Sequence, residues 1–451
     1  MPRAFLPGAG RDASLVEPAT DLQLLTATEA ARRIREGRLS SEELVEACLD
    51  RIEAREAEVR AWELLDRRQA MDQARRRDRE ARLGPLHGVP VGVKDIIDTA
   101  DMPTTYGSPI YRGHLPERDA DCVVRLRRAG AVILGKTVTT EFAVYHPGRT
   151  RNPLDRQRTP GGSSSGSAAA VADAMVPAAL GSQTAGSTIR PAAYCGIFGF
   201  KPTYGTLSGA GVWRLSDTLD TLGVLARAVE DLALLCQVLA GPDPGDPSIF
   251  FPLEISSPPR LAFVRTPHWD AVEPPVQKLI ESAAEELAGA GAPIDEVDTP
   301  PSFDDLAQAQ MTIMDVEVAR SLGSICEGHG DAISESLREL IERGLATSGE
   351  IYEQALELAD RGRGELPELF AGHDVLLTPA VSGEAPAGLE STGDPLHCRT
   401  WTLLGLPTAA VPGLEGPEGM PVGVQLVGPR GDDRGVLRAA RWVAAQLEQG
   451  G

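Results

Sequence analysis

The sequence predicts a single large α/β domain with a layer of helices at its N-terminal end. The chain has 451 residues, of which 42% are hydrophobic, so it can bury an extensive core. Short runs rich in β-branched residues and bounded by glycine alternate with helix-like stretches, a rhythm typical of parallel sheets. No internal repeat and no long linker divides the sequence, which favours one domain over two or three.

The N-terminal part is predicted to be helical. Residues 1–20 are expected to form a flexible arm, and residues 21–451 the folded domain. Over residues 22–82, apolar side chains recur at three- and four-residue spacing, which indicates amphipathic helices. Ser40 and Glu43 have the spacing of a capping box and should begin the second of these helices.

Predicted strands and helices then alternate to the end of the chain. The strands are short, apolar and bounded by Gly, Pro or charged residues. They are expected at residues 88–98, 130–137, 260–266, 374–380 and 421–428. Helical patterns occur at residues 119–130, 231–241, 274–292 and 434–449.

Charge and composition exclude several functions. With 44 Lys and Arg against 65 Asp and Glu, the net charge is −21, so neither nucleic-acid binding nor membrane binding is expected. No apolar run reaches the roughly 18 residues of a membrane span. The N-terminus lacks the apolar stretch of a signal peptide, and we therefore expect a soluble, cytoplasmic protein. Six scattered cysteines without a CxxC pair, and the absence of HExxH, predict neither a disulfide framework nor a metal site.

Two motifs match patterns of other enzyme classes. Residues 130–137 fit the phosphate-loop pattern GxxxxGKT, but the Ala, Val, Ile and Leu between the glycines predict a strand instead of a phosphate-binding turn. Residues 162–166 fit GxSxG with Ser164 at the centre, but the preceding segment is polar and contains two prolines, whereas a nucleophile elbow follows a strand. ATP binding and a conventional Ser–His–Asp triad are therefore disfavoured. The triad stays open as an alternative, because a His and an acid could follow downstream in the sequence.

Lysine is rare and small residues are concentrated in one segment. Nearly all basic residues are arginines, and lysine occurs only at Lys94, Lys136, Lys201 and Lys278. Arginine stays protonated in proteins, whereas a buried lysine can act as a neutral base.

Residues 159–205 contain the clusters GGSSSGS and QTAGS, whose small residues can leave backbone N–H groups free to face a ligand. Either cluster alone would be an ordinary tightly packed loop.

Together these motifs resemble the amidase signature family. The similar segments cover nearly the whole chain from about residue 22 in the family's order, and they include three of the four lysines. They are GVPVGVKD around Lys94, GKTVTTEF at 135–142, TPGGSSSGSAAAVA at 159–172, GSQTAGSTIRPAAYCGIFGFKPT at 181–203, DVLLTPA at 374–380, and GLPTAAVPG to MPVGVQLVG at 405–428. The resemblance implies a mixed, mostly parallel, twisted β-sheet sandwiched by helices.

The resemblance also implies a Ser–cisSer–Lys triad that needs no metal and no organic cofactor. The lysine of GVKD is Lys94, the first serine of GGSSS is Ser163 after a cis peptide bond, and the serine that ends QTAGS is Ser187. Neutral Lys94 would take a proton from Ser163, which takes one from Ser187, so that Ser187 can attack an amide carbonyl. The N–H groups expected to form the oxyanion hole belong to Thr184, Ala185, Gly186 and Ser187.

One motif departs from the commoner family form, which reads DTGGSIR. Gln183 replaces the aspartate, Ala185 replaces a glycine, and Arg190 falls three residues after the serine instead of two. This arrangement resembles the malonamidase-like branch, whose arginine at that place binds a substrate carboxylate. A guanidinium group offers a planar fork of donors suited to a carboxylate. Arg190 is predicted either to bind an acidic group on a small amide or to serve as a structural brace.

The predicted function is hydrolysis of the C–N bond of a small carboxamide, with a preference for amides that bear a carboxylate. Two alternatives stay open: a partner-dependent amidotransferase A-type subunit, and an esterase or acyl-transferring biosynthetic enzyme with the same triad. The GSQTAGSTIR variant and the net charge of −21 argue against a tRNA-linked subunit. The expected partner is a small-molecule amide, and the resemblance adds a homodimer as an expectation.

Overall fold

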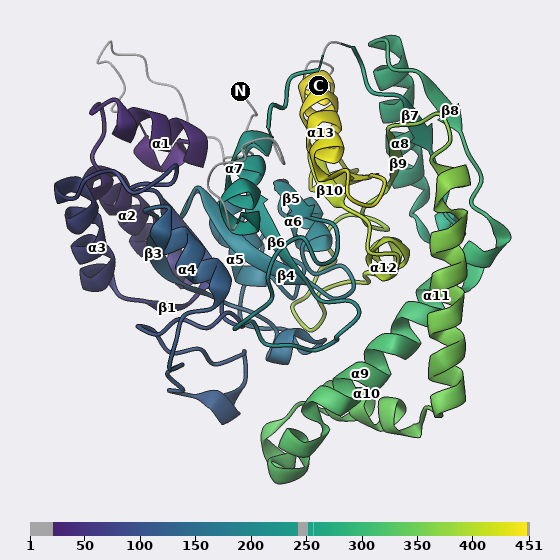
Figure 1. Ribbon diagram of the computed structural model, residues 1–451, viewed down its shortest axis with the longest axis horizontal. Helices are drawn as coiled ribbons and strands as arrows, with labels where there is room; N and C mark the ends of the chain where they lie inside the picture. Colours follow the sequence, from purple (N-terminus) through teal and green to yellow (C-terminus); the bar gives the residue numbers. More distant parts are fainter. Residues whose placement is uncertain (1–20, 242–250, 256, 449–451) are drawn as a thin grey trace.

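A single β-sheet forms the centre of the molecule (Figure 1). The computed structural model describes residues 21–241, 251–255 and 257–448, and the arm expected over residues 1–20 lies outside them. In this part of the chain the sheet has eleven strands, in the order β1-β3-β2-β4-β6-β5-β10-β11-β9-β7-β8. The prediction of one α/β domain is confirmed, because β5 pairs with β10 and so joins strands of both halves of the chain.

The predicted strand segments all form strands of this sheet. Residues 132–137 of the segment that fits the phosphate-loop pattern form strand β3, so the residues between its two glycines do not make a phosphate-binding turn. The strands are β1 (Trp62–Leu65), β2 (Pro90–Lys94), β3 (Val132–Thr137), β4 (Ala178–Gln183), β5 (Phe198–Lys201), β6 (Thr221–Ala226), β7 (Leu261–Phe263), β8 (Ile294–Glu296), β9 (Val375–Pro379), β10 (Thr408–Glu415) and β11 (Pro421–Val427).

The sheet is mixed, as expected. Parallel pairing occurs in two blocks, β3-β2-β4 and β9-β7-β8, which give four parallel pairs. The six other neighbouring pairs are antiparallel. Antiparallel pairing is therefore more extensive than the strand–helix–strand rhythm indicated, because β5 and β6, and β10 and β11, follow each other without a crossover helix.

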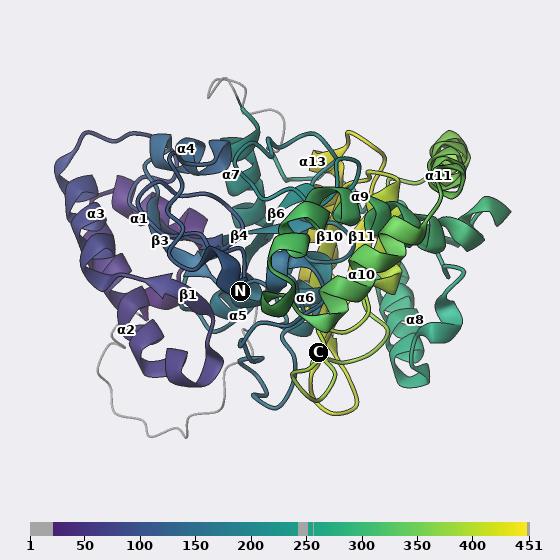
Figure 2. The same ribbon diagram turned by 90° about the horizontal axis from the view of Figure 1, so that it is seen from below.

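The helical N-terminal layer consists of α1 (Ala27–Arg35), α2 (Ser41–Val59) and α3 (Arg67–Arg79). Both views show these helices at one end of the sheet (Figures 1 and 2). The predicted capping box is confirmed at the start of α2. The Glu43 N–H donates to Ser40 Oγ at 3.1 Å, and the Ser40 N–H donates to the Glu43 carboxylate at 2.8 Å.

The other helices cover both faces of the sheet and its far end. They are α4 (Asp121–Arg128), α5 (Ser165–Ala172), α6 (Ile189–Tyr194), α7 (Val229–Ala240), α8 (Pro274–Gly289), α9 (Leu306–Gly328), α10 (Glu335–Ala346), α11 (Gly349–Leu369), α12 (Leu396–Leu403) and α13 (Asp433–Leu447). Figure 2 shows α4, α7 and α13 on one face and α5 and α6 on the other, so helices sandwich the sheet as predicted.

The helix that follows the Ser163 motif, α5, is completely buried. All eight residues of α5 are buried, which small side chains permit. A Cβ atom at Gly166 would lie 2.2 Å from the Ala61 carbonyl oxygen, so only glycine fits there. The six cysteines are all buried and unpaired. None of the helices in the described ranges has the length and apolar character needed to cross a membrane.

Candidate active site

The ends of β2 and β4 bring the predicted catalytic residues together. The two strands are parallel neighbours, so their carboxyl ends meet at the same edge of the sheet. Lys94 ends β2, and β4 leads into the loop that carries Ser187. The loop that carries Ser163 contacts the loop that carries Ser187. The contact is a hydrogen bond of 3.3 Å from the Ser164 N–H to the Ser187 carbonyl oxygen.

Lys94 contacts Ser163 inside the protein. The Lys94 side chain is fully buried, and its Nζ donates to Ser163 Oγ at 2.7 Å. The Gly162–Ser163 peptide bond is cis. Burial lowers the pKa of Lys94 to about 7, and the negative charge of Asp220 opposes this shift. A large fraction of Lys94 is therefore a neutral amine at pH 7, the form that can accept a proton.

A second hydroxyl group, which the sequence analysis did not identify, also contacts Lys94. Lys94 Nζ donates to Ser182 Oγ at 2.8 Å. Ser182 lies on β4 directly before Gln183, inside the motif GSQTAGS. The motif was a signal for this residue, but residue spacing alone does not show which of several hydroxyls reaches the lysine.

Side chains from distant elements hold residues 184–187, which we call the oxyanion loop. Gln310 on α9 donates to the Thr184 carbonyl oxygen at 3.0 Å. Thr402 on α12 donates to the Ala185 carbonyl oxygen at 2.7 Å. In a planar trans peptide the C=O and the following N–H point in opposite directions, so fixing these carbonyl groups also fixes the N–H groups that follow them.

The N–H groups of the oxyanion loop are free to bind a ligand. Among the hydrogen bonds of the described residues, none is donated by the N–H of Ala185, Gly186 or Ser187. A Cβ atom at Gly186 would lie 2.8 Å from Pro395 Cβ and 3.2 Å from Cys398 Cβ. The loop is thus packed against the start of α12, which restrains N–H groups that could stabilise an oxyanion.

Gln183 caps the helix that follows the oxyanion loop. Its Oε1 accepts hydrogen bonds from the N–H groups of Thr188 and Ile189 at 2.9 and 3.1 Å, and its Nε2 donates to Thr402 Oγ1 at 2.9 Å. An aspartate, as in the commoner motif, could accept the first two bonds but could not donate the third. The amide therefore links the loop to α12.

Arg190 is buried and donates to protein oxygen atoms. Its Nη1 donates to the Gly393 carbonyl oxygen at 2.5 Å, and its Nη2 donates to the Gly162 carbonyl oxygen at 2.8 Å and to Thr392 Oγ1 at 3.1 Å. Its Nε is buried without a hydrogen-bond partner in the described structure. These contacts favour the second of the two predicted roles, a brace that holds the peptide preceding Ser163.

The lysines at positions 136 and 201 lie outside this constellation. Lys136 forms a fully buried ion pair with Asp95 at 2.9 Å. Lys201 is also fully buried, and its Nζ donates to the carbonyl oxygens of Leu406 at 2.5 Å and Pro202 at 3.2 Å. Both contacts join segments of the fold, so we interpret these two lysines as structural.

One partly buried acid, Asp220, supports the site without any sequence signal. Asp220 accepts a hydrogen bond from Thr184 Oγ1 at 2.6 Å, and also from the N–H groups of Leu215 and Ser216. Burial raises the pKa of Asp220 to about 6, although these hydrogen bonds oppose the shift. Within the described ranges, no group of three or more His, Cys, Asp or Glu side chains is arranged to hold a metal ion.

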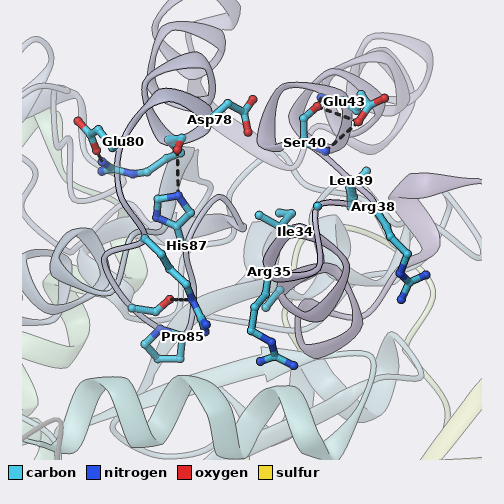
Figure 3. Close-up of a pocket in the computed structure, with 15 residues that line it drawn as sticks. Ile34, Arg35, Arg38, Leu39, Ser40, Glu43, Asp78, Glu80, Pro85 and His87 are labelled. Atoms are coloured by element: carbon cyan, nitrogen blue, oxygen red, sulfur yellow. Dashed lines mark hydrogen bonds and ion pairs between the residues drawn. The ribbon is translucent and has the colours of Figure 1, made fainter.

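A cavity of about 560 Å³ lies elsewhere, among the N-terminal helices (Figure 3). It is lined by residues of α1, α2, α3 and the segment 80–87, near the start of β2, whereas Lys94 lies at the end of that strand. Its polar groups pair with each other: Arg77 binds Glu80 at 2.6 Å, and His87 Nε2 contacts the Arg77 carbonyl oxygen at 2.9 Å. The predicted catalytic residues are absent from its lining, so we assign it no part in the chemistry.

The fold and the site together define a class of protein: a single-domain α/β enzyme with a buried serine and lysine at the edge of its sheet. The profile of the family described as Amidase matches residues 43–437. The chain belongs to this family, the amidase signature enzymes, which act on amide C–N bonds. The predictions of family, fold class and enzyme class are confirmed.

Relatives span almost the full length of the chain. The A subunit of glutamyl-tRNA(Gln) amidotransferase from Anaeromyxobacter sp. (strain K) is 37% identical over 485 residues, covering 95% of this chain and 98% of that protein. A crystal structure of an amidase has a TM-score of 0.85 at 33% identity, covering 93% of this chain and 99% of that one. The structure of 6-aminohexanoate cyclic dimer hydrolase with substrate has a TM-score of 0.83 at 28% identity, covering 95% and 98%.

Proposed function

We propose that this protein hydrolyses a small carboxamide through an acyl-enzyme on Ser187, with Ser163 and Lys94 as its proton relay. The observation that carries the proposal is the 2.7 Å hydrogen bond between Lys94 Nζ and Ser163 Oγ, in a position where burial lowers the pKa of the lysine to about 7. A serine hydroxyl needs a neighbouring base to become a nucleophile, and this lysine supplies one.

The reaction then follows from the order of the groups. Neutral Lys94 accepts the proton of Ser163, Ser163 accepts the proton of Ser187, and Ser187 Oγ attacks the carbonyl carbon. The tetrahedral oxyanion accepts hydrogen bonds from the N–H groups of the oxyanion loop, one such donor being worth about 3 kcal/mol of transition-state stabilisation. The proton returns through Ser163 to the departing amine, and water releases the acid by the same relay.

We also propose that the preferred amide bears a carboxylate. The departure from the DTGGSIR form supports this preference, since Arg190 occupies the position of the carboxylate-binding arginine in the similar branch. The contacts of Arg190 in this structure show a guanidinium already bound to three protein oxygen atoms. The acidic preference and the residue responsible for it are therefore separate questions for experiment.

A second candidate function is that of an amidotransferase A-type subunit. It is favoured by eight curated relatives that are such subunits, at 33–37% identity over more than 90% of this chain. Such a subunit would be isolated with partner chains and would depend on them for full activity. Purification under mild conditions from the native cell, followed by mass spectrometry, distinguishes a multi-subunit complex from a chain active alone.

The deciding experiment is ammonia release from malonamic and succinamic acids beside propanamide, butanamide and benzamide. We expect release by the wild-type protein and a loss of at least about 10⁴-fold in Ser187→Ala, because the nucleophile is gone. Parallel assays with the ethyl esters of the same acids measure the esterase alternative. Equal turnover by Ser187→Ala and wild type would reject the acyl-enzyme on Ser187.

A further inference from the structure

We propose that Arg399 is the residue that binds the carboxylate of the substrate, an inference that rests on the proposed amide hydrolysis. Arg399 lies on α12 and is 4% exposed. Its Nη1 donates to Gln310 Oε1 at 2.5 Å. Among the described residues, no carboxylate lies within 4.0 Å of it, so it is a buried cation without an acidic partner.

Two other buried guanidinium groups in this protein donate more hydrogen bonds to the fold than Arg399 does. Arg227 donates four hydrogen bonds to carbonyl oxygens, and Arg190 donates three hydrogen bonds to protein oxygens. Arg399 donates one, to a neutral amide. A buried charge is costly unless it is paired or hydrogen-bonded. An anionic ligand that accepts hydrogen bonds from the unfilled donors of Arg399 would offset this cost.

The unfilled donors of Arg399 are not completely sealed inside the protein. Arg190 Nε is sealed inside the protein without a partner, whereas Nε and Nη2 of Arg399 are not among the sealed, unpartnered atoms of the described structure. A ligand could therefore approach these two atoms of Arg399. Two parallel N–H donors on one guanidinium match the two oxygens of a carboxylate.

The position of Arg399 fits a short substrate. The neighbouring residue Cys398 packs against Gly186, and Gln310, which binds Arg399, also binds the Thr184 carbonyl oxygen. One amide side chain thus links the guanidinium to the oxyanion loop. In malonamic or succinamic acid only one or two methylene groups separate the amide from the carboxylate, so a carboxylate site for such substrates has to lie beside this loop.

The acid near the oxyanion loop does not compete for this cation. Asp220 accepts hydrogen bonds from Thr184 Oγ1 and from the N–H groups of Leu215 and Ser216. Among the described residues, no ion pair joins Asp220 to Arg399. Thr184 of the loop is thus linked to an acid whose charge is hydrogen-bonded and, through Gln310, to a cation with unfilled donors that could bind an anionic substrate group.

The test compares succinamic acid with butanamide, in which a methyl group replaces the carboxylate. We expect Arg399→Gln to lower kcat/KM for succinamic acid roughly 10- to 100-fold, mainly through KM, since hydrogen bonds to charged groups have this strength. Turnover of butanamide should change less than about threefold. Arg399→Lys, which keeps the charge but loses the fork, should give an intermediate value.

A matched control removes another arginine that touches the same helix. Arg363 donates to the Leu403 carbonyl oxygen at the end of α12, at 2.8 Å, and lies outside the site. Arg363→Gln should leave both substrates unchanged. Circular dichroism and thermal unfolding of each variant confirm that the fold persists.

A binding measurement separates this inference from the proposed function. Succinate should bind the Ser187→Ala protein in calorimetry, and adding Arg399→Gln should weaken binding at least about tenfold. If succinate binds in this way but no amide is turned over, Arg399 keeps its role and the proposed hydrolysis fails. If amides are turned over without acidic preference and succinate does not bind, hydrolysis stands and the inference about Arg399 is wrong.

Two further outcomes would overturn the inference. Equal losses on succinamic acid and butanamide in Arg399→Gln would make Arg399 a positioning residue that acts through Gln310 on the oxyanion loop. A preference for acids that survives in Arg399→Gln but disappears in Arg190→Lys would assign the carboxylate to Arg190.

Discussion

The ends of strands β2 and β5 each carry a fully buried lysine, and the two differ in what they contact. Burial lowers the pKa of both Lys94 and Lys201 to about 7. Lys94 donates to the hydroxyl of Ser163, whereas Lys201 donates to the carbonyl oxygen of Leu406. A hydroxyl can transfer a proton to a neutral amine and a backbone carbonyl cannot. A lowered pKa therefore identifies a base only where the partner of the amine carries a transferable proton.

The largest expected effect is the loss of activity when Lys94 is replaced. Lys94→Met should lower kcat/KM for amide hydrolysis by about 10³- to 10⁴-fold, because the relay loses its base. Assays of ammonia release, with thermal unfolding as the control for folding, measure it. Lys278→Met provides a matched control, because that lysine is exposed on α8. A Lys94→Met enzyme within tenfold of the wild type would contradict the assignment of Lys94 as the base.

The pH dependence gives the next largest effect. The folded-state pKa of Lys94 is about 7, well below the ordinary value, so the neutral form gains population as the pH rises. With a neutral amide such as butanamide, kcat/KM should rise about tenfold per pH unit below 7 and level off above it. A profile that is flat from pH 5 to 8 would show that no base with this pKa limits the reaction.

A smaller effect is expected from crowding the oxyanion loop. A Cβ atom at Gly186 would lie 2.8 Å from Pro395 Cβ, so Gly186→Ala should displace the loop and lower kcat by about tenfold or more. Gly209→Ala is the matched control, since no atom lies within 4 Å of a Cβ atom there. Equal activity of the two variants would argue against a packed, preformed oxyanion hole.

The smallest effect on activity is expected at the structural lysine. Lys201→Met should keep kcat within about threefold of the wild type while lowering the free energy of unfolding by about 1–3 kcal/mol, because the carbonyl group of Leu406 loses its donor. Denaturant unfolding measures the stability. A loss of activity as large as that of Lys94→Met would make the lysine at the end of β5 part of the chemistry and would abolish the contrast.

Local patterns predicted five of the eleven strands, and the resemblance of the motifs to the amidase signature family supplied the three residues of the proposed triad. The β-branched run that ends at Lys94 forms β2, and the small-residue clusters place Ser163 and Ser187 on loops at the same edge of the sheet. These features depend on residues near each other in the chain, where period and glycine spacing carry the information.

The supporting shell could not be predicted in this way. Gln310, Arg399 and Thr402 lie more than 100 residues after the oxyanion loop and carry no motif that points to it. Gln310 and Thr402 reach the loop, and Arg399 reaches Gln310, because β10 pairs with β5 and brings α12 and α9 of the second half of the chain against the first half. Such contacts follow from strand order, which sequence periodicity does not specify.

The most direct test of the account is covalent labelling with a fluorophosphonate, read by mass spectrometry of the digested protein. The account predicts a phosphonyl group on Ser187, formed at a rate that Lys94→Met lowers strongly and Lys201→Met leaves nearly unchanged. Labelling of Ser164, the central serine of the GxSxG pattern, would contradict it. An unchanged rate of Ser187 labelling in Lys94→Met would contradict it equally.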